Sequence, residues 1–226
     1  MVFAAAERAG WTGDTHPEHI WFGTMLGEDG KPFKTRSGGT IRLSDLLDDA
    51  VVRARAVVDA KSPELQAQER AAIANAVGIG AVKYADLATT RQRALVFSFD
   101  RMLALDGNTA PYLLYAAVRA GSIAARAGER STVVATITEP VEHALLLKLA
   151  AFTDVLDEVA ATLEPHRLCT YLYELAGQYT SFYEACPVLK ADTPEQRSSR
   201  LALCTLTAET LTRGLGLLGI TVPARM

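Results

Sequence analysis

Residues 27–39 form a glycine-rich, basic segment whose composition suits phosphate chemistry. Its 13 residues include four glycines, three cations and two hydroxyl side chains. Backbone N–H groups in such loops, together with lysine or arginine, can hold a phosphate group. The spacing matches neither the Walker A loop nor the dinucleotide-binding glycine pattern. Two interpretations are therefore open, a nucleotide-contacting loop and an ordinary hairpin loop.

The other reactive side chains give little support for metal or nucleophile chemistry. His16 and His19 lie on either side of Pro17, so they cannot form a metal-binding pair on one regular helix face. The three cysteines are 17 and 18 residues apart, unlike the close pairs of zinc sites. We expect these cysteines to be small buried side chains. We expect no metal site. The sequence also indicates no general base that would activate a serine or cysteine as a nucleophile.

Aromatic and basic side chains offer a second kind of chemistry, the contact with unpaired bases and phosphates. One segment contains the aromatic residues Tyr171, Tyr173, Tyr179, Phe182 and Tyr183. Exposed rings stack on unpaired bases and contribute roughly 1–3 kcal/mol each, whereas buried rings would fill a core. Nine arginines between residues 53 and 130 could contact phosphates if they share a surface, or could be scattered and solvated.

The elements that must position these residues fall into three stretches. In residues 1–60 the only strand-like pieces are 19–26 and 40–43, after which Ser44 predicts the N-cap of a helix. Residues 61–130 have a helical pattern. Within them, 62–64 predict a helix start, 78–80 an interruption and 105–111 a loop.

The third stretch, residues 131–226, has the clearest pattern. Apolar residues step by three and four along 145–163, 168–186 and 201–218, and each stripe would line one helix face. Prolines separate the stripes. Thr193 and Gln196 predict a capping box at the start of the third helix. Three helices joined by short loops predict an antiparallel bundle.

The composition and the first residues indicate the class of protein and its location in the cell. A hydrophobic content of 49% suits an ordinary globular protein, and no apolar run reaches the ~18 residues that span a bilayer. The first residues lack the pattern of a secretory signal, so we expect a cytoplasmic protein with no membrane partner. The net charge of −3 is unusual for a nucleic-acid binder, although a local basic face is compatible with it.

Five segments of the sequence resemble bacterial-type arginyl-tRNA synthetases, which are class I aminoacyl-tRNA synthetases. They are MLGEDGKPFKTRSGGTIRLSDLLDDAV, VGIGAVKYADL, DRMLALDGNTAPYLLYA, EPHRLCTYLYELAGQYTSFYEACPVL and LLGITVPARM. The segments occur in the family's order and extend over nearly the whole chain. The resemblance implies a mainly α fold. It consists of the end of a Rossmann-type catalytic domain (1–60), a helical stem-contact region (61–130) and a DALR-type anticodon-binding bundle (131–226).

The family joins arginine to tRNA-Arg with ATP and Mg²⁺, and the resemblance implies site residues for that reaction. The candidates for the ATP loop, in the place of the KMSKS motif, are Phe33, Lys34, Thr35 and Arg36. Lys34 and Arg36 would contact the ATP phosphates and neutralise charge on the pyrophosphate leaving group. The candidates for tRNA binding are Tyr84, Asn108 and Tyr112 near the acceptor side and inner corner, and Tyr179, Tyr183 and Met226 near the anticodon loop.

The family's HIGH-like motif is absent from these residues, so we expect no arginine activation and no tightly bound ATP without a separate amino-terminal catalytic half. Self-association through the surface left by that half is a further expectation. Three positions depart from the family pattern. The family usually has glutamine at the position of Leu114, histidine or another polar group at Ala117, and an acidic residue at Ser98. The loss of these polar groups predicts weaker function at the acceptor end of the tRNA. An alternative is a free-standing module that binds tRNA or protein without ligase activity.

Overall fold

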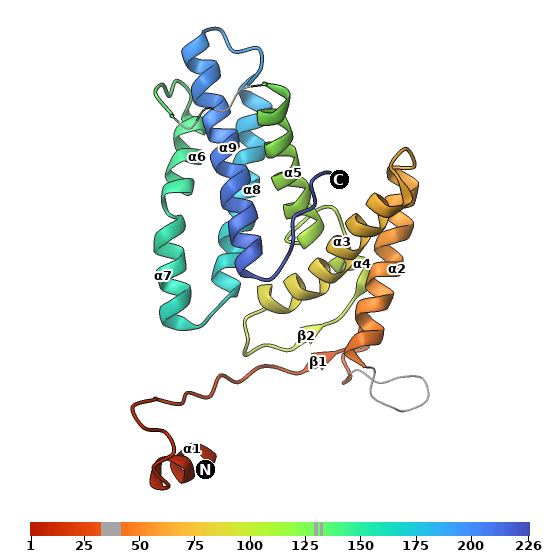
Figure 1. Ribbon diagram of the computed structural model, residues 1–226, viewed down its shortest axis with the longest axis vertical. Helices are drawn as coiled ribbons and strands as arrows, with labels where there is room; N and C mark the ends of the chain where they lie inside the picture. The colour runs from red at the N-terminus through yellow and green to blue at the C-terminus, as the bar shows by residue number, and fades with distance from the viewer. Residues whose placement is uncertain (33–41, 129–130, 132) are drawn as a thin grey trace.

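The structure is a computed structural model and describes residues 1–32, 42–128, 131 and 133–226. Helices predominate, as predicted for a mainly α fold (Figure 1). The elements are α1 (Val2–Arg8), β1 (Met25–Leu26), α2 (Leu43–Lys61), α3 (Ala67–Ala88), β2 (Leu95–Val96), α4 (Phe99–Met102), α5 (Ala110–Arg126), α6 (Pro140–Ala150), α7 (Phe152–Thr162), α8 (His166–Ala185) and α9 (Pro194–Leu217). None of the described helices has the length and apolar character needed to cross a membrane.

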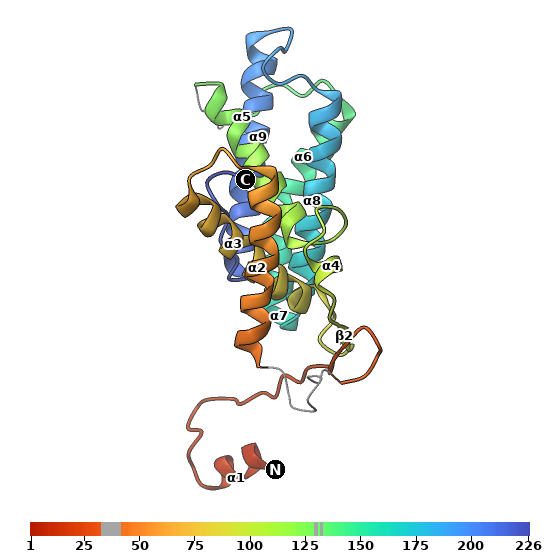
Figure 2. The same ribbon diagram turned by 90° about the vertical axis from the view of Figure 1, so that its right-hand side faces the viewer.

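Helices α2 and α3 pack along each other as an antiparallel pair (Figures 1 and 2). The predicted interruption at residues 78–80 is wrong, because α3 continues through them. Gly78 instead permits close helix packing: a Cβ atom there would lie 2.7 Å from the Cα and N atoms of Val51 on α2. A glycine pattern that resembles a break is here a contact between two backbones.

The predicted helix starts in this region are displaced by a few residues. Helix α2 begins at Leu43 with Arg42 as N-cap, so Ser44 lies inside the first turn. Helix α3 begins after Gln66, whose backbone N–H donates to Glu69 Oε2 at 3.3 Å in a capping box. The reciprocal bonds of this box explain why the helix starts here and not at residues 62–64.

Two short strands connect the first stretch to the chain beyond α3. Strand β1 pairs with β2 in parallel, with Met25 opposite Leu95 and Leu26 opposite Val96. Only the last two residues of the predicted 19–26 strand are therefore in a strand. Of the predicted 40–43 strand, residues 40 and 41 lie outside the described residues, and Leu43 begins α2.

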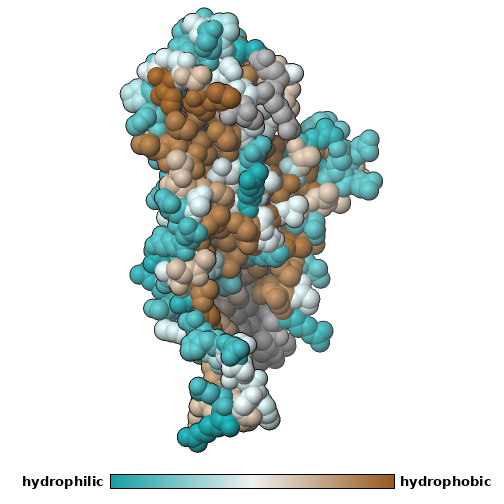
Figure 3. All heavy atoms as spheres, turned by 60° about the vertical axis from the view of Figure 1, so that its left-hand side comes forward, coloured by the Kyte–Doolittle hydropathy of each residue, from teal (hydrophilic) through white to brown (hydrophobic). Residues whose placement is uncertain are grey.

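Helices α5, α6, α8 and α9 pack around the largest hydrophobic core, and α7 lies against α8 at its edge. The second and third predicted helices are confirmed as α8 and α9. The first is divided at Ala151, which ends α6 and begins α7. Leu145 is fully buried, but no residue of α7 is. Figure 3 shows apolar side chains on the upper part of this side of the bundle. On α6, Leu147 is 58% exposed.

A buried ion pair joins α6 to α9. Arg200 Nε donates to Glu142 Oε1 at 2.6 Å, and the other carboxylate oxygen accepts the backbone N–H of Thr138 at 2.7 Å. At the start of α9, Thr193 Oγ1 accepts the Gln196 N–H at 3.2 Å, which confirms the predicted N-cap. The predicted capping box is incomplete, because the Gln196 side-chain oxygen accepts no hydrogen bond from the described residues. The Gln196 amide donates to Thr138 Oγ1 at 3.4 Å, so its side chain ties α9 to the segment before α6.

Hydrogen bonds from three side chains attach α3 and the segment after it to the bundle. Lys83 Nζ donates to the Gly219 carbonyl at 2.6 Å, beyond the end of α9. Arg91 donates to the Leu163 carbonyl at 2.7 Å, at the end of α7. The Tyr84 hydroxyl donates to the Cys169 carbonyl of α8 at 2.9 Å. These bonds fix the α2–α3 pair against the helices that carry the candidate interface.

Candidate nucleic-acid interface

One face of α5 carries aromatic and basic side chains at helical spacing. They are Tyr112, Tyr115, Arg119, Ser122 and Arg126. Steps of three and four residues place side chains above one another on one side of a helix. Tyr115 is 49% exposed, and Ser122 and Arg126 are also exposed. The face offers both a ring for stacking and cations for phosphate contact.

Helix α8 runs beside α5 in the same direction and adds two more rings to this surface. Tyr173, which is 36% exposed, lies with its ring centroid 5.7 Å from that of Tyr112. About two turns further along α5 and three turns further along α8, the Arg119 guanidinium lies 4.1 Å from the Tyr183 ring centroid. We name Tyr112, Tyr115, Arg119, Tyr173 and Tyr183 the α5–α8 face.

Two of the predicted tRNA contacts are buried. Tyr179 is 1% exposed, with its hydroxyl 3.9 Å from Cys204 Sγ, and burial raises the pKa of its hydroxyl. Tyr84 is also 1% exposed, and burial likewise raises its pKa. The stripe period that places Tyr179 in the bundle core is the reason that its ring cannot stack on a base. The prediction that these two side chains contact tRNA directly is therefore corrected, and both support neighbouring groups.

Asn108 and Met226 are the two remaining candidates, and their contacts are with residues outside the α5–α8 face. Asn108 is exposed on the loop before α5, and its side-chain oxygen is 2.6 Å from the Tyr84 hydroxyl. Met226 is partly buried against the main core. An ion pair between Arg225 and Glu69 ties the residue before it to the start of α3. Met226 is thus held near α3, and the recorded contacts do not bring it to Tyr183.

The ATP-loop candidates Phe33, Lys34, Thr35 and Arg36 lie outside the described residues. The structure does describe the turn that leads to them. The Gly27 N–H donates to the Lys31 carbonyl at 2.8 Å, and Leu26 and Pro32 form an antiparallel bridge. Strand β1 positions this turn by pairing with β2.

The three departures from the family pattern are buried. Leu114 is 0% exposed, Ala117 is 3% and Ser98 is 5%. These side chains pack inside the protein and present no surface to RNA. The prediction that these changes remove polar groups near tRNA is therefore wrong. All three side chains are buried, so the changes alter the core.

Neither Tyr115 as a candidate nor the contact of Arg119 with Tyr183 was identified from the sequence. The spacing could have indicated both residues, since they continue the steps of three and four that start at Tyr112 on an otherwise alanine-rich helix. What could not be read from spacing is that α8 places Tyr173 and Tyr183 beside this stripe. That placement depends on how α5 and α8 pack.

Comparison with known proteins identifies the family. The profile described as the DALR anticodon binding domain matches residues 113–226, and the profile of the class I tRNA synthetase (R) catalytic domain matches residues 1–99. The chain belongs to the arginyl-tRNA synthetase family. The α5–α8 face therefore lies almost wholly within a DALR domain, with Tyr112 directly before it.

Individual relatives agree with this assignment. The chain is 54% identical over its whole length to an arginine–tRNA ligase of Thermobifida fusca and 56% identical to one of Frankia casuarinae. It spans about 40% and 39% of those proteins. The solved structure of the Thermus thermophilus arginyl-tRNA synthetase superposes with a TM-score of 0.86 at 32% identity, over all of this chain and 38% of that one. A Plasmodium falciparum arginyl-tRNA synthetase shares the fold, with a TM-score of 0.78 at 24% identity.

Proposed function

We propose that this chain supplies the tRNA-binding portion of an arginine–tRNA ligase, and that the α5–α8 face contacts the anticodon side of tRNA-Arg. The observation that carries the proposal is a row of rings with one guanidinium group on a DALR domain, in which Tyr115 and Tyr173 are exposed and the other members are half-buried. Unpaired bases stack on such rings irrespective of their identity. Tyr183, which the resemblance places near the anticodon loop, remains a candidate within this face. Tyr112 also remains a candidate, although the resemblance places it near the acceptor side and inner corner.

The charge of the protein predicts an unusual salt dependence for this binding. The net charge is −3, and the cations on this side of α5 are the half-buried Arg119 and the exposed Arg126. If these two neutralise one phosphate each, affinity for single-stranded RNA would fall about sevenfold between 50 and 200 mM salt. Stacking is insensitive to salt by comparison. The proposed interface thus depends on rings more than on charge.

Binding of the chain to labelled tRNA-Arg and to a non-cognate tRNA, each at two salt concentrations, tests the proposal. We expect selective binding with a shallow salt slope, weakened by the double substitution Tyr115→Ala and Tyr183→Ala. Trp11→Ala, which removes an 82% exposed ring from the chain's first segment, is the matched control. Equal loss in the control, or no selectivity for tRNA-Arg, would sink the proposal.

The ligase reaction itself would need the rest of a class I catalytic domain. We propose that Lys34 and Arg36 then contact the phosphates of ATP bound with Mg²⁺, as the resemblance implies. Their substitution by alanine should abolish arginylation in the complete enzyme and leave tRNA affinity unchanged. A cytoplasmic site of action follows from this proposed role in translation.

A separate observation favours a protein partner. Large apolar side chains before β1 are highly exposed, namely Phe3, Trp11, Trp21 and Phe22. Exposed apolar clusters mark surfaces that other protein covers. We propose that the remainder of a class I catalytic domain covers them. Mixing the chain with the amino-terminal part of the Thermobifida fusca ligase should give a 1:1 complex by light scattering. A stable homodimer unaffected by that partner would instead favour self-association.

A further inference from the structure

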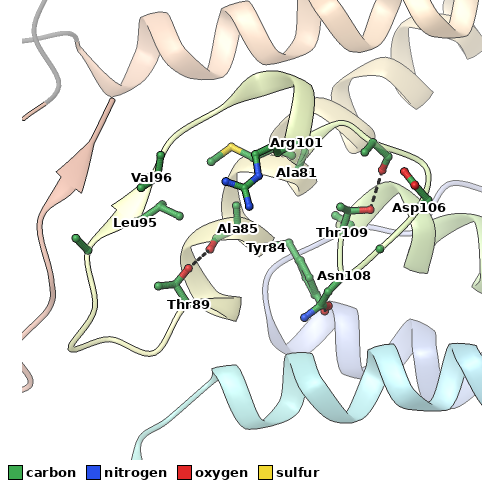
Figure 4. A pocket seen from close by; sticks show the side chains of 15 residues that line it. Ala81, Tyr84, Ala85, Thr89, Leu95, Val96, Arg101, Asp106, Asn108 and Thr109 are labelled. Carbon is green, nitrogen blue, oxygen red and sulfur yellow. Dashed lines mark hydrogen bonds between the residues drawn. The ribbon is translucent and has the colours of Figure 1, made fainter. Parts of the chain in front are cut away.

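A second polar site is formed by part of the region 1–99 and by the segment that follows it. An open pocket of about 640 Å³ is lined by α3, β2, α4 and the loop 103–109 (Figure 4). Its volume lies within the roughly 300–1,000 Å³ of small-ligand sites. Figure 4 shows the Arg101 guanidinium directed into the pocket from α4, with Asp106 and Asn108 on the loop at the other side. The floor is apolar and includes Ala81, Ala85 and Leu95.

The two charged side chains of this pocket, Arg101 and Asp106, are available to a ligand. Within the part of the chain that the structure describes, neither Arg101 nor Asp106 has a hydrogen bond or ion pair. By contrast, Arg55 and Arg70 on the α2–α3 pair both contact Asp59. A guanidinium and a carboxylate that face one pocket without bonding to each other can each take a ligand group.

The third polar group, Asn108, is oriented by Tyr84. The Tyr84 hydroxyl lies 2.6 Å from the Asn108 side-chain oxygen and 2.9 Å from the Cys169 carbonyl oxygen. A neutral hydroxyl has one proton, and the high pKa that burial gives Tyr84 keeps that proton bound. When the proton goes to Cys169, the Asn108 amide turns to donate to Tyr84, and its oxygen becomes a free acceptor. Asn108 can thus present either an N–H or an oxygen to a ligand.

We infer that this pocket binds a single ribonucleotide, with its phosphate on Arg101, its ribose hydroxyls on Asp106 and its base edge on Asn108. Carboxylates accept hydrogen bonds from ribose hydroxyls, and guanidinium groups bind phosphate oxygens. An amide that can donate or accept suits a base edge, and the apolar floor suits a base face. Two ligands offer these groups, an unstacked nucleotide of an RNA chain and a free mononucleotide. Only the choice of RNA as the source rests on the proposed function.

Titrations of ¹⁵N-labelled protein with AMP, CMP, GMP and UMP test the inference directly. The readouts are the Asn108 side-chain amide and the Arg101 Nε–H resonances. We expect saturable shifts of both with at least one ribonucleotide, and none with inorganic phosphate alone. The matching deoxyribonucleotide should bind about tenfold more weakly, the effect of losing one hydrogen bond to a charged group. Arg101→Gln and Asp106→Asn should each weaken binding, whereas Arg55→Gln should not.

Addition of tRNA-Arg distinguishes the two sources. Displacement of the mononucleotide, with weaker tRNA binding by Arg101→Gln, would assign the pocket to a nucleotide of the RNA. Simultaneous binding of both would assign it to a free mononucleotide. Ribonucleotide binding without any tRNA affinity would uphold the pocket and overturn the proposed function. The inference is overturned if no ribonucleotide shifts Asn108 saturably and Arg101→Gln leaves tRNA affinity unchanged.

Discussion

The guanidinium of Arg119 lies 4.1 Å from the centroid of the Tyr183 ring, which joins α5 to α8 through a cation–π contact. The contact restrains the orientation of the ring, which is half-buried. Beneath it, the ring of Tyr179 lies 6.3 Å from that of Tyr183 at an interplanar angle of 35°. The half-buried Tyr183 ring therefore has contacts with Arg119 and Tyr179 before any RNA arrives. A preorganised ring loses less conformational entropy on binding.

Arg119→Ala should weaken binding of tRNA-Arg by about 1–3 kcal/mol, because it removes a phosphate contact and the support of Tyr183. Arg119→Lys keeps the charge but not the planar group, so it should recover the salt slope and only part of the affinity. Equilibrium binding at three salt concentrations measures both quantities. Full recovery of affinity by lysine would show that Tyr183 needs no planar partner.

Substitutions at Tyr179 and Tyr183 should separate the buried ring from the exposed one. Tyr179→Phe removes a hydroxyl whose recorded partner is the weak acceptor Cys204 Sγ, so tRNA affinity should be unchanged. Tyr183→Leu should reduce affinity about 5- to 150-fold, the range for one lost base stack, and Tyr183→Phe should retain most of it. A large loss of affinity in folded Tyr179→Phe would restore Tyr179 as a direct contact.

Gly78→Ala should destabilise the protein although alanine favours helices. The new Cβ atom would lie 2.7 Å from the Val51 backbone, and relief of such overpacking costs about 1–3 kcal/mol. Gly177→Ala is the matched control, since a Cβ atom on this α8 residue meets nothing within 4 Å. It should stabilise by about 0.5–1 kcal/mol. Urea denaturation measures both, and equal effects would contradict the close α2–α3 packing.

The buried pair of Glu142 and Arg200 predicts a loss of stability in acid. Burial alone raises the pKa of Glu142, but the hydrogen bonds from Thr138, Arg200 and Glu139 outweigh it, so the pKa lies below its ordinary value of 4.5. The carboxylate's contribution is therefore complete above pH 4.5 and is lost as the pH falls through the lower folded-state pKa.

Glu142→Gln should cost about 3–5 kcal/mol at pH 7, because it leaves the Arg200 charge buried without its partner. The variant should also lose the part of the acid sensitivity that Glu142 causes. Urea midpoints between pH 7 and pH 3.5 measure this, with the exposed Glu184→Gln as control. An unchanged pH profile in Glu142→Gln would assign the acid sensitivity to other carboxyl groups.

Local sequence patterns were sufficient to predict the helices whose apolar stripes and capping residues indicate the same boundaries. The Thr193 cap, the apolar stripes of α8 and α9 and the loop before α5 all depend on neighbouring residues, and the structure confirms them. The resemblance, carried by contiguous strings, was sufficient for the family. Both kinds of inference use information that lies within a few residues along the chain.

Tertiary contacts decided what spacing left open. Gly78 lies within a helix, with the backbone of Val51 from another helix against it. Of the predicted 19–26 strand, Met25 and Leu26 form the ladder with β2. The same holds for the candidate sites. Tyr179 and Tyr183 are four residues apart on one helix, yet Cys204 lies beside the first and Arg119 beside the second. Which ring is free to meet RNA depends on residues far away in sequence, because burial is set by the packing of whole helices.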